Sequence, residues 1–207
     1  MAWWPHTCVG CDVLGHRVCL DCAPDELHDV TTQVDGVAHT WHMAKYAGPL
    51  GTVIRQVKYR PDRHLGKRLA ARMATACRGH LSPSDIDAVV AVPSTPWTRF
   101  RRGFELATLL ADDVARALGR PNIRALSVRG ARHQAGLNRV QRRLNLAGRV
   151  TGRRQVPPHV LLVDDVFTTG ATAEACALAL LQEGASRVWM VTACHADTNS
   201  QTALQIW

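Results

Sequence analysis

The sequence lacks the long apolar runs that membrane-spanning and secreted proteins carry. No stretch approaches the roughly 18 uncharged apolar residues that a transmembrane helix needs. Residues 1–6 contain no basic segment that leads into an apolar one, so they do not resemble a secretory signal. We therefore expect a cytoplasmic protein without a membrane span.

Charged residues are also few, at 20% of the 207 residues, whereas hydrophobic residues make up 46%. This balance excludes a disordered chain and supplies enough apolar material for a sizeable core. The length fits one domain of ordinary size with a small appended module.

Acidic residues are absent between residues 114 and 163, a segment that contains eleven arginines. Lysine is scarce throughout, at three of the 25 cationic residues. Arginine suits the bidentate binding of phosphate. A GC-rich genome would explain arginine in place of lysine, but not the missing acids. The segment therefore indicates nucleic acid or a polyphosphate ligand as a partner.

Four cysteines near the start have the spacing of a zinc site, C-x2-C-x7-C-x2-C. They are Cys8, Cys11, Cys19 and Cys22. Each C-x2-C turn presents two thiolates to one metal, and four thiolates close a tetrahedral shell, which makes the zinc structural. The alternatives are four free thiols or two disulfides, and disulfides are disfavoured in a cytoplasmic protein. The scattered Cys77, Cys176 and Cys194 are expected to be buried apolar residues.

The apolar pattern breaks between residues 25 and 35, so we expect a zinc module over residues 1–35 and a second domain over 36–207. The module is acidic, with six acids and one arginine, a net charge of −5, which leaves +13 for the remainder. A segment this short must fold around its metal.

After residue 36, apolar runs typical of strands alternate with amphipathic helical segments. We predict strands at 37–43, 87–92, 123–128, 159–163 and 187–193, and helices at 50–59, 65–78, 105–118, 138–146 and 171–183. This alternation predicts an α/β fold with a mostly parallel sheet flanked by helices.

The strongest signal is the run VLLVDDVFTTGAT at residues 160–172. An apolar strand ends in two acids, a Thr-Thr-Gly turn follows, and a helix begins. Such a junction directs backbone N–H groups and the positive end of a helix dipole at one point, which suits a phosphate. Carboxylates at the end of the strand can accept hydrogen bonds from vicinal sugar hydroxyls. The alternative is a structural strand–helix junction with two solvated acids.

This run resembles the signature of type I phosphoribosyltransferases, which bind 5-phosphoribosyl-1-pyrophosphate (PRPP). A P-loop and a Rossmann glycine motif are absent from it. The resemblance implies that Asp164 and Asp165 are catalytic and that the ligand is PRPP or a ribose phosphate with Mg²⁺. The implied binding residues are Val163, Asp164, Asp165, Thr168, Thr169, Gly170, Ala171 and Thr172.

A second resemblance covers nearly the whole chain and rests on the order of several short elements. These are the four cysteines, YAGPL at 46–50, IRQVKY at 54–59, Val92-Pro93, Arg102-Gly103-Phe104, Gln134-x-x-Leu137, Arg142-x-x-Asn145 and the PRPP run. The order is similar to the ComF family of competence-associated proteins. The family resemblance implies a zinc module joined to a phosphoribosyltransferase domain, and a role in DNA uptake through single-stranded DNA and the competence machinery.

The chain departs from the family pattern at three places. Glu105-Leu106 stand where Asn-Gln is common, Gln141 replaces a Glu, and Ala91 replaces the first proline of Pro-Val-Pro. Glu105 adds a negative charge beside the segment 94–104, which is the candidate pyrophosphate loop.

Transfer of a phosphoribosyl group expels pyrophosphate, whose negative charge calls for Mg²⁺ and cations. We expect Arg99, Arg101 and Arg102 of the candidate pyrophosphate loop, and Arg132 and Arg142 of a glycine-containing flap over residues 129–154, to supply them. The alternative for these arginines is a solvated basic surface. Lys58 is equally consistent with a surface residue and with a ligand contact.

Three functions remain open from the sequence. The chain is a PRPP-binding protein of DNA uptake that binds single-stranded DNA, an active phosphoribosyltransferase of nucleotide salvage, or a regulator that senses PRPP. The motif predicts ligand binding and leaves turnover undecided, because a fold also hosts proteins that are not enzymes.

Overall fold

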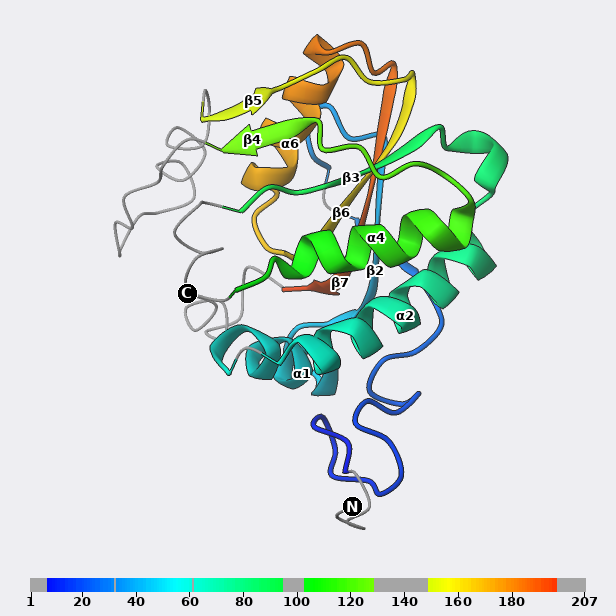
Figure 1. The fold of residues 1–207 in the computed structure, drawn as a ribbon, viewed down its shortest axis with the longest axis vertical. Helices are drawn as coiled ribbons and strands as arrows, with labels where there is room; N and C mark the ends of the chain where they lie inside the picture. Colours follow the sequence, from blue (N-terminus) through cyan, green and yellow to red (C-terminus); the bar gives the residue numbers. More distant parts are fainter. Residues whose placement is uncertain (1–6, 32, 61, 95–102, 129–148, 197–207) are drawn as a thin grey trace.

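A five-stranded sheet runs through the centre of the molecule (Figure 1). The computed structural model describes residues 7–31, 33–60, 62–94, 103–128 and 149–196. The strand order is β1-β2-β7-β6-β3, and all neighbours are parallel except β1 and β2. The strands are β1 (His28–Asp29), β2 (His39–Lys45), β3 (Ala88–Ala91), β6 (His159–Phe167) and β7 (Arg187–His195). A second, antiparallel sheet pairs β4 (Leu126–Val128) with β5 (Val150–Gly152).

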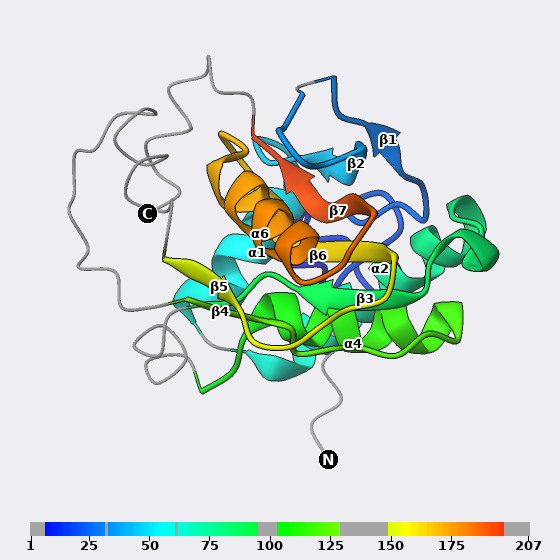
Figure 2. The same ribbon diagram turned by 90° about the horizontal axis from the view of Figure 1, so that it is seen from above.

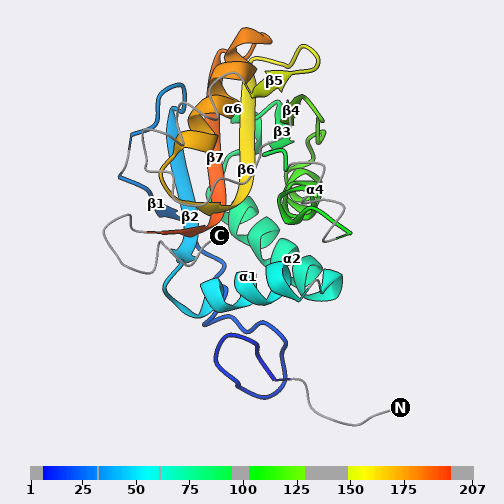
Figure 3. The same cartoon turned by 90° about the vertical axis from the view of Figure 1, so that its left-hand side faces the viewer.

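Helices cover both faces of the central sheet, and Figures 2 and 3 show α6 on the side opposite α4. The helices are α1 (Pro49–Tyr59), α2 (Arg63–His80), α4 (Leu106–Leu118) and α6 (Ala171–Gln182), with a short 3-10 helix, η1 (Pro83–Asp85). Buried side chains of β6 alternate between the two layers. Leu161 and Val163 pack in the core with α1, α2 and α4, whereas Val160 and Leu162 pack with α6. This two-residue alternation is that of a strand buried on both faces.

Local sequence explains where the helices begin and end. Pro49 occupies the start of α1, where the missing N–H costs nothing. The Asp62 carboxylate accepts hydrogen bonds from the N–H groups of His64 and Leu65 and caps α2. Gly119 ends α4 in the left-handed conformation, with φ of 65°.

The structure confirms the α/β class, the mostly parallel sheet and the helices predicted at 50–59, 65–78, 105–118 and 171–183. The expected helix at 138–146 lies outside the described residues. Strand 123–128 is shorter than predicted, since only Leu126–Val128 pairs as β4. The three scattered cysteines are fully buried, as expected.

None of the helices in the described part of the chain combines the length and the apolar character that crossing a membrane requires.

Candidate functional site

The two acids of the candidate PRPP run lie within β6 rather than after it. The predicted strand ended at Val163, but pairing with β7 continues through Asp164, opposite Thr192, to Phe167, opposite His195. The prediction was wrong because β7 offers backbone partners beyond the apolar run, and these partners hold a strand that composition alone would end. Both acids are half-buried, and the Asp164 carboxylate accepts a 2.8 Å hydrogen bond from the Asp165 N–H.

Consecutive residues of a strand face opposite sides of its sheet. Asp165 is on the side of α1, where its carboxylate meets a lysine of that helix. Asp164 is on the side of α6, where burial and the Asp164 charge together raise the pKa of Cys176. The pair therefore joins the two layers at one end of β6, and its members have different surroundings.

The lysine is Lys58, in the last turn of α1. Its Nζ donates to Asp165 Oδ1 at 2.7 Å, and each side chain is 14% exposed. Sequence reasoning left Lys58 undecided between the surface and the ligand site. The structure places it at the acidic pair, because α1 packs against β2 and β7, and β7 is the neighbour of β6 in the sheet.

Burial is the main cause that raises the pKa of Asp164, and the Asp165 charge raises it further. The positive charge of Lys58 and the hydrogen bond from the Asp165 N–H lower the pKa, but their effect is smaller. The pKa of Asp164 therefore reaches about 8. Two carboxylates this close do not both ionise readily. The Asp164 carboxyl is therefore mainly protonated at neutral pH, beside the Asp165–Lys58 contact.

The turn after β6 leads directly into α6, as predicted. Gly170 precedes the helix with φ of 80°, and a Cβ there would lie 2.9 Å from Val34 Cγ2. The Thr169 hydroxyl accepts a 3.4 Å hydrogen bond from the Ala171 N–H. The first N–H groups of a helix have no acceptor in their own helix, so the start of α6 can bind an anion. Glycine is therefore favoured at position 170 for structural reasons as well as for the close approach of a phosphate. Its φ is positive, and a side chain there would collide with Val34.

The four N-terminal cysteines come together as their spacing predicts. Their sulfur atoms all lie within 4.8 Å of one another, and the Cys11 and Cys19 sulfurs are 3.5 Å apart. The N–H groups of Gly10 and Cys19 each donate to the Cys8 sulfur at 3.4 Å. Although burial raises it, these N–H groups lower the pKa of Cys8 to about 7. The cluster could bind a metal ion, and four thiolates with N–H donors suit zinc.

The cysteine cluster packs against α1 and α2. Arg17 pairs with Asp62, the cap of α2, and Arg72 of α2 pairs with Asp25 at 3.1 Å. Three apolar residues of the segment, Val18, Ala23 and Leu27, belong to the same buried core as α1, α2 and α4. The division of the chain at residue 35 stays a prediction, and the segment before it shares a core with the body.

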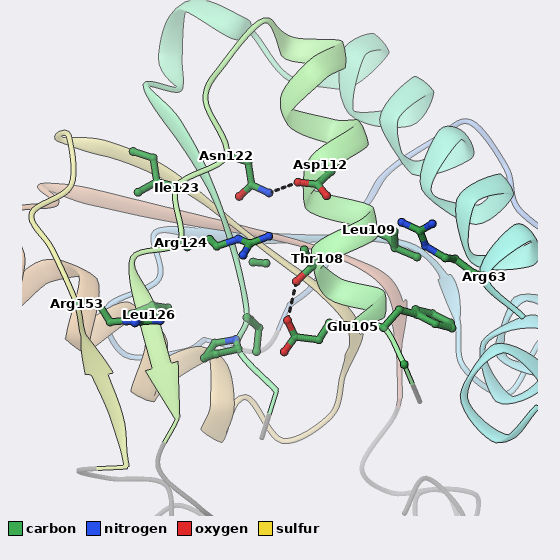
Figure 4. Close-up of a pocket in the computed structure, with 15 residues that line it drawn as sticks. Arg63, Glu105, Thr108, Leu109, Asp112, Asn122, Ile123, Arg124, Leu126 and Arg153 are labelled. Atoms are coloured by element: carbon green, nitrogen blue, oxygen red, sulfur yellow. Dashed lines mark hydrogen bonds between the residues drawn. The ribbon is translucent and has the colours of Figure 1, made fainter. Parts of the chain in front are cut away.

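A cavity of about 390 Å³ lies between α4, the end of β3 and the β4–β5 pair (Figure 4). Its walls combine apolar residues with three arginines, Arg63, Arg124 and Arg153, and two acids, Glu105 and Asp112. At one side, Glu105 accepts hydrogen bonds from Thr108 Oγ1 at 3.1 Å and the Ser94 N–H at 3.3 Å. The Glu105 carboxylate, which departs from the family pattern, therefore links the first residue of the candidate pyrophosphate loop to the start of α4. Sequence reasoning did not find this cavity, because its walls come from distant segments.

The cations predicted to hold pyrophosphate lie outside the described residues, so their roles stay predictions. They are Arg99, Arg101, Arg102, Arg132 and Arg142.

Known proteins similar to this chain carry names that refer to competence or to DNA utilization. Competence protein F of Haemophilus influenzae is 30% identical over 154 residues, which cover 69% of this chain and 66% of that protein, slightly under two thirds of its length. DNA utilization protein YhgH of Escherichia coli O6:H1 is 30% identical over 164 residues, 74% of this chain and 70% of that protein. The protein of the same name from Salmonella typhimurium is 28% identical over 166 residues, with the same two coverages of 74% and 70%. No protein-family model matches the chain.

Proposed function

Since the chain belongs to the ComF family, we propose that it is a PRPP-binding protein that serves the uptake and use of DNA. The relatives are named for competence and for DNA utilization, which supports the second half of this proposal.

The main support for PRPP as the ligand is the geometry of the junction between β6 and α6. It combines the Asp164–Asp165 pair near the end of a buried strand with the N-terminus of α6. The turn and helix start would bind the 5-phosphate, and the carboxylates would accept hydrogen bonds from the ribose hydroxyls.

The acidic pair also fits the Mg²⁺ that accompanies PRPP. Carboxylate and phosphate oxygens are the ligands that Mg²⁺ prefers, and the ion usually binds through one or two carboxylates together with substrate phosphates. When bound, Mg²⁺ would neutralise charge on the pyrophosphate group. The raised pKa of Asp164 fits a carboxyl that ionises when a cation arrives.

Turnover would use the same residues. As pyrophosphate leaves the anomeric carbon, the sugar gains positive charge, and the carboxylates of Asp164 and Asp165 would stabilise it. The enzyme alternative requires transfer to an acceptor, whereas the sensor alternative requires binding alone. Release of pyrophosphate on addition of nucleobases separates the two.

Binding of single-stranded DNA is supported by the cavity beside α4. Its apolar walls suit the face of a base, and Arg63, Arg124 and Arg153 suit phosphates. The cavity adjoins β4 and β5, which both belong to the acid-free arginine segment between residues 114 and 163.

Titration calorimetry with PRPP, with and without Mg²⁺, tests the ligand. We expect binding that requires Mg²⁺ and that falls at least about tenfold in Thr169→Ala, since one hydroxyl that bonds a charged phosphate contributes that much. Thr75→Ala on α2, whose hydroxyl bonds the Ala71 carbonyl, is the matched control. If the parent protein does not bind PRPP, the β6–α6 junction has only a structural role and the proposal is wrong.

A further inference from the structure

Exposed apolar side chains gather on the cysteine segment. In the described part of the chain five large apolar side chains are exposed, and three of them lie between the cysteines: Val13, Leu14 and Leu20, at 50%, 65% and 55% exposure. Leu20 directly follows Cys19, Val13 comes two residues after Cys11, and the sulfurs of these two cysteines are 3.5 Å apart. The three apolar side chains therefore belong to neighbouring loops, and together we call them the apolar tip.

The apolar tip lies at one end of the molecule. Figures 1 and 3 show the cysteine segment on the far side of α1 and α2 from the central sheet. The apolar residues on the inner side of the segment, Val18, Ala23 and Leu27, already pack in the core of the body. The tip therefore has no share in that core, and its exposure is not explained by the fold.

Backbone hydrogen bonds fix the shape of the tip. The Cys8 N–H donates to the Val13 carbonyl at 2.8 Å, and Thr7 pairs with Leu14 in an isolated antiparallel bridge. Asp12 forms the turn between these contacts, with φ of 60°. A surface that is already ordered loses little conformational entropy when a partner covers it, which favours binding.

The tip is also acidic. Asp12 and Asp21 are exposed directly beside Val13 and Leu20, and within the described part of the chain neither acid forms an ion pair. Residues 1–35 hold six acids and one arginine, whereas the rest of the chain is strongly basic. Four thiolates around one zinc ion would add further negative charge. An acidic surface repels the phosphates of DNA and the headgroups of anionic lipids, and it attracts a surface of positive charge.

From this combination we propose that the apolar tip is a docking site for a partner protein, through a segment of that protein that combines lysine or arginine with apolar side chains. The apolar groups would cover Val13, Leu14 and Leu20, and the cations would meet Asp12 and Asp21. The site is independent of the proposed function, because the ligand and DNA sites proposed above use other residues. A partner can therefore dock at the tip while the body holds either ligand.

The experiment measures the fluorescence anisotropy of three labelled peptides with the zinc-loaded full chain. The first peptide has leucine and lysine at the spacing of an amphipathic helix, the second has serine in place of leucine, and the third has glutamate in place of lysine. We expect the first to bind at least about tenfold more tightly than either of the others. Replacing Leu14 and Leu20 together with Ser should lower its affinity at least about tenfold. Leu178→Ser, which changes a side chain 45% exposed on α6, is the matched control and should not alter it.

The charges are tested separately. Asp12→Asn and Asp21→Asn should each weaken binding of the first peptide and reduce its dependence on salt. Asparagine tolerates the positive φ of Asp12, so the turn is kept. Asp85→Asn, exposed in η1, should leave the salt dependence unchanged. These variants keep the test decisive should the double serine variant lose its zinc.

Three results would overturn the proposal. They are equal binding of the three peptides by the parent, full affinity of a zinc-loaded double serine variant, and self-association of the parent that the double variant loses. Sedimentation velocity measures the last, which would assign the tip to a second copy of this chain. None of these measurements involves PRPP, so calorimetry with PRPP tests the proposed function separately.

Discussion

The Lys58 ammonium and the Asp165 carboxylate meet at 2.7 Å although 107 residues separate them in the chain. This contact joins the last turn of α1 to the end of β6, where the acidic pair precedes the turn into α6. It also separates the roles of the two acids. Asp165 has a permanent counter-ion, whereas Asp164 is left to respond to pH and to ligands.

The first prediction concerns the pH dependence of stability. Because the pKa of Asp164 is raised from 3.8 to about 8, the folded protein keeps a proton that the unfolded chain has already lost above about pH 4. This contribution is therefore fully present below the unfolded pKa and is lost as pH rises through 8. Between pH 5 and pH 8, the free energy of unfolding of the parent should fall by about 1 kcal/mol or more because of this group. Asp164→Asn should remove that fall. Urea denaturation of both proteins at the two pH values measures it, and parallel declines would contradict the assignment.

The second prediction follows from the same carboxyl. If a ribose ligand with Mg²⁺ ionises Asp164, binding at pH 7 should release close to one proton. Calorimetry in two buffers of different ionisation enthalpy measures the release. Asp164→Asn should abolish it, whereas Asp112→Asn, an exposed carboxylate on α4, should not. An equal proton release from the parent and from Asp164→Asn would show that a group other than Asp164 releases the proton.

The third prediction concerns the turn before α6. Gly170→Ala should destabilise the ligand-free protein by about 1–2 kcal/mol, because it places a side chain at positive φ and its Cβ against Val34. Gly79→Ala is the matched control, since a Cβ there meets nothing within 4 Å and alanine favours the helix. Thermal denaturation without ligand measures both. Equal stability of Gly170→Ala and the parent would show that the turn tolerates a side chain.

The fourth prediction concerns the metal. Protein purified without chelator should contain one zinc per chain, and Cys19→Ser should lose it. Because Val18, Ala23 and Leu27 share a core with α1 and α2, the loss should also destabilise the body of the molecule. Elemental analysis and thermal denaturation measure the two effects. Cys77→Ala, far from the cluster in the chain and buried in α2, should retain full zinc content. A parent protein without zinc would contradict the assignment.

The fifth prediction concerns single-stranded DNA. If Arg124 and Arg153 contact phosphates, replacing each with Ala should reduce the slope of log affinity against log salt by about 0.7. Arg78→Ala, exposed near the end of α2, should leave the slope unchanged. Fluorescence anisotropy with a labelled oligonucleotide over a range of salt measures the slopes. Unchanged slopes in the Arg124→Ala and Arg153→Ala variants would show that these arginines are solvated surface residues that do not contact DNA phosphates.

The features that sequence reasoning predicted correctly depend on neighbouring residues. The cysteine spacing predicts that Cys8, Cys11, Cys19 and Cys22 come together, and the structure confirms it. The strand, turn and helix around Gly170 follow from an apolar run, two threonines and a glycine in succession. Spacing and periodicity act over a few residues, so they can be read without knowing the fold.

Tertiary structure decided what the acidic pair contacts. The length of β6 depends on β7, whose backbone holds Asp164 in the sheet, and the partner of Asp165 comes from α1. Neither could be predicted, because a backbone hydrogen bond or an ion pair between distant segments leaves no periodic trace in the sequence. The chain alone thus determined which residues are chemically capable of binding a sugar phosphate. The packing of α1 and α6 on opposite faces of β6 decided which acid is paired and which is protonated, since burial and a nearby cation set the charge of a carboxyl group.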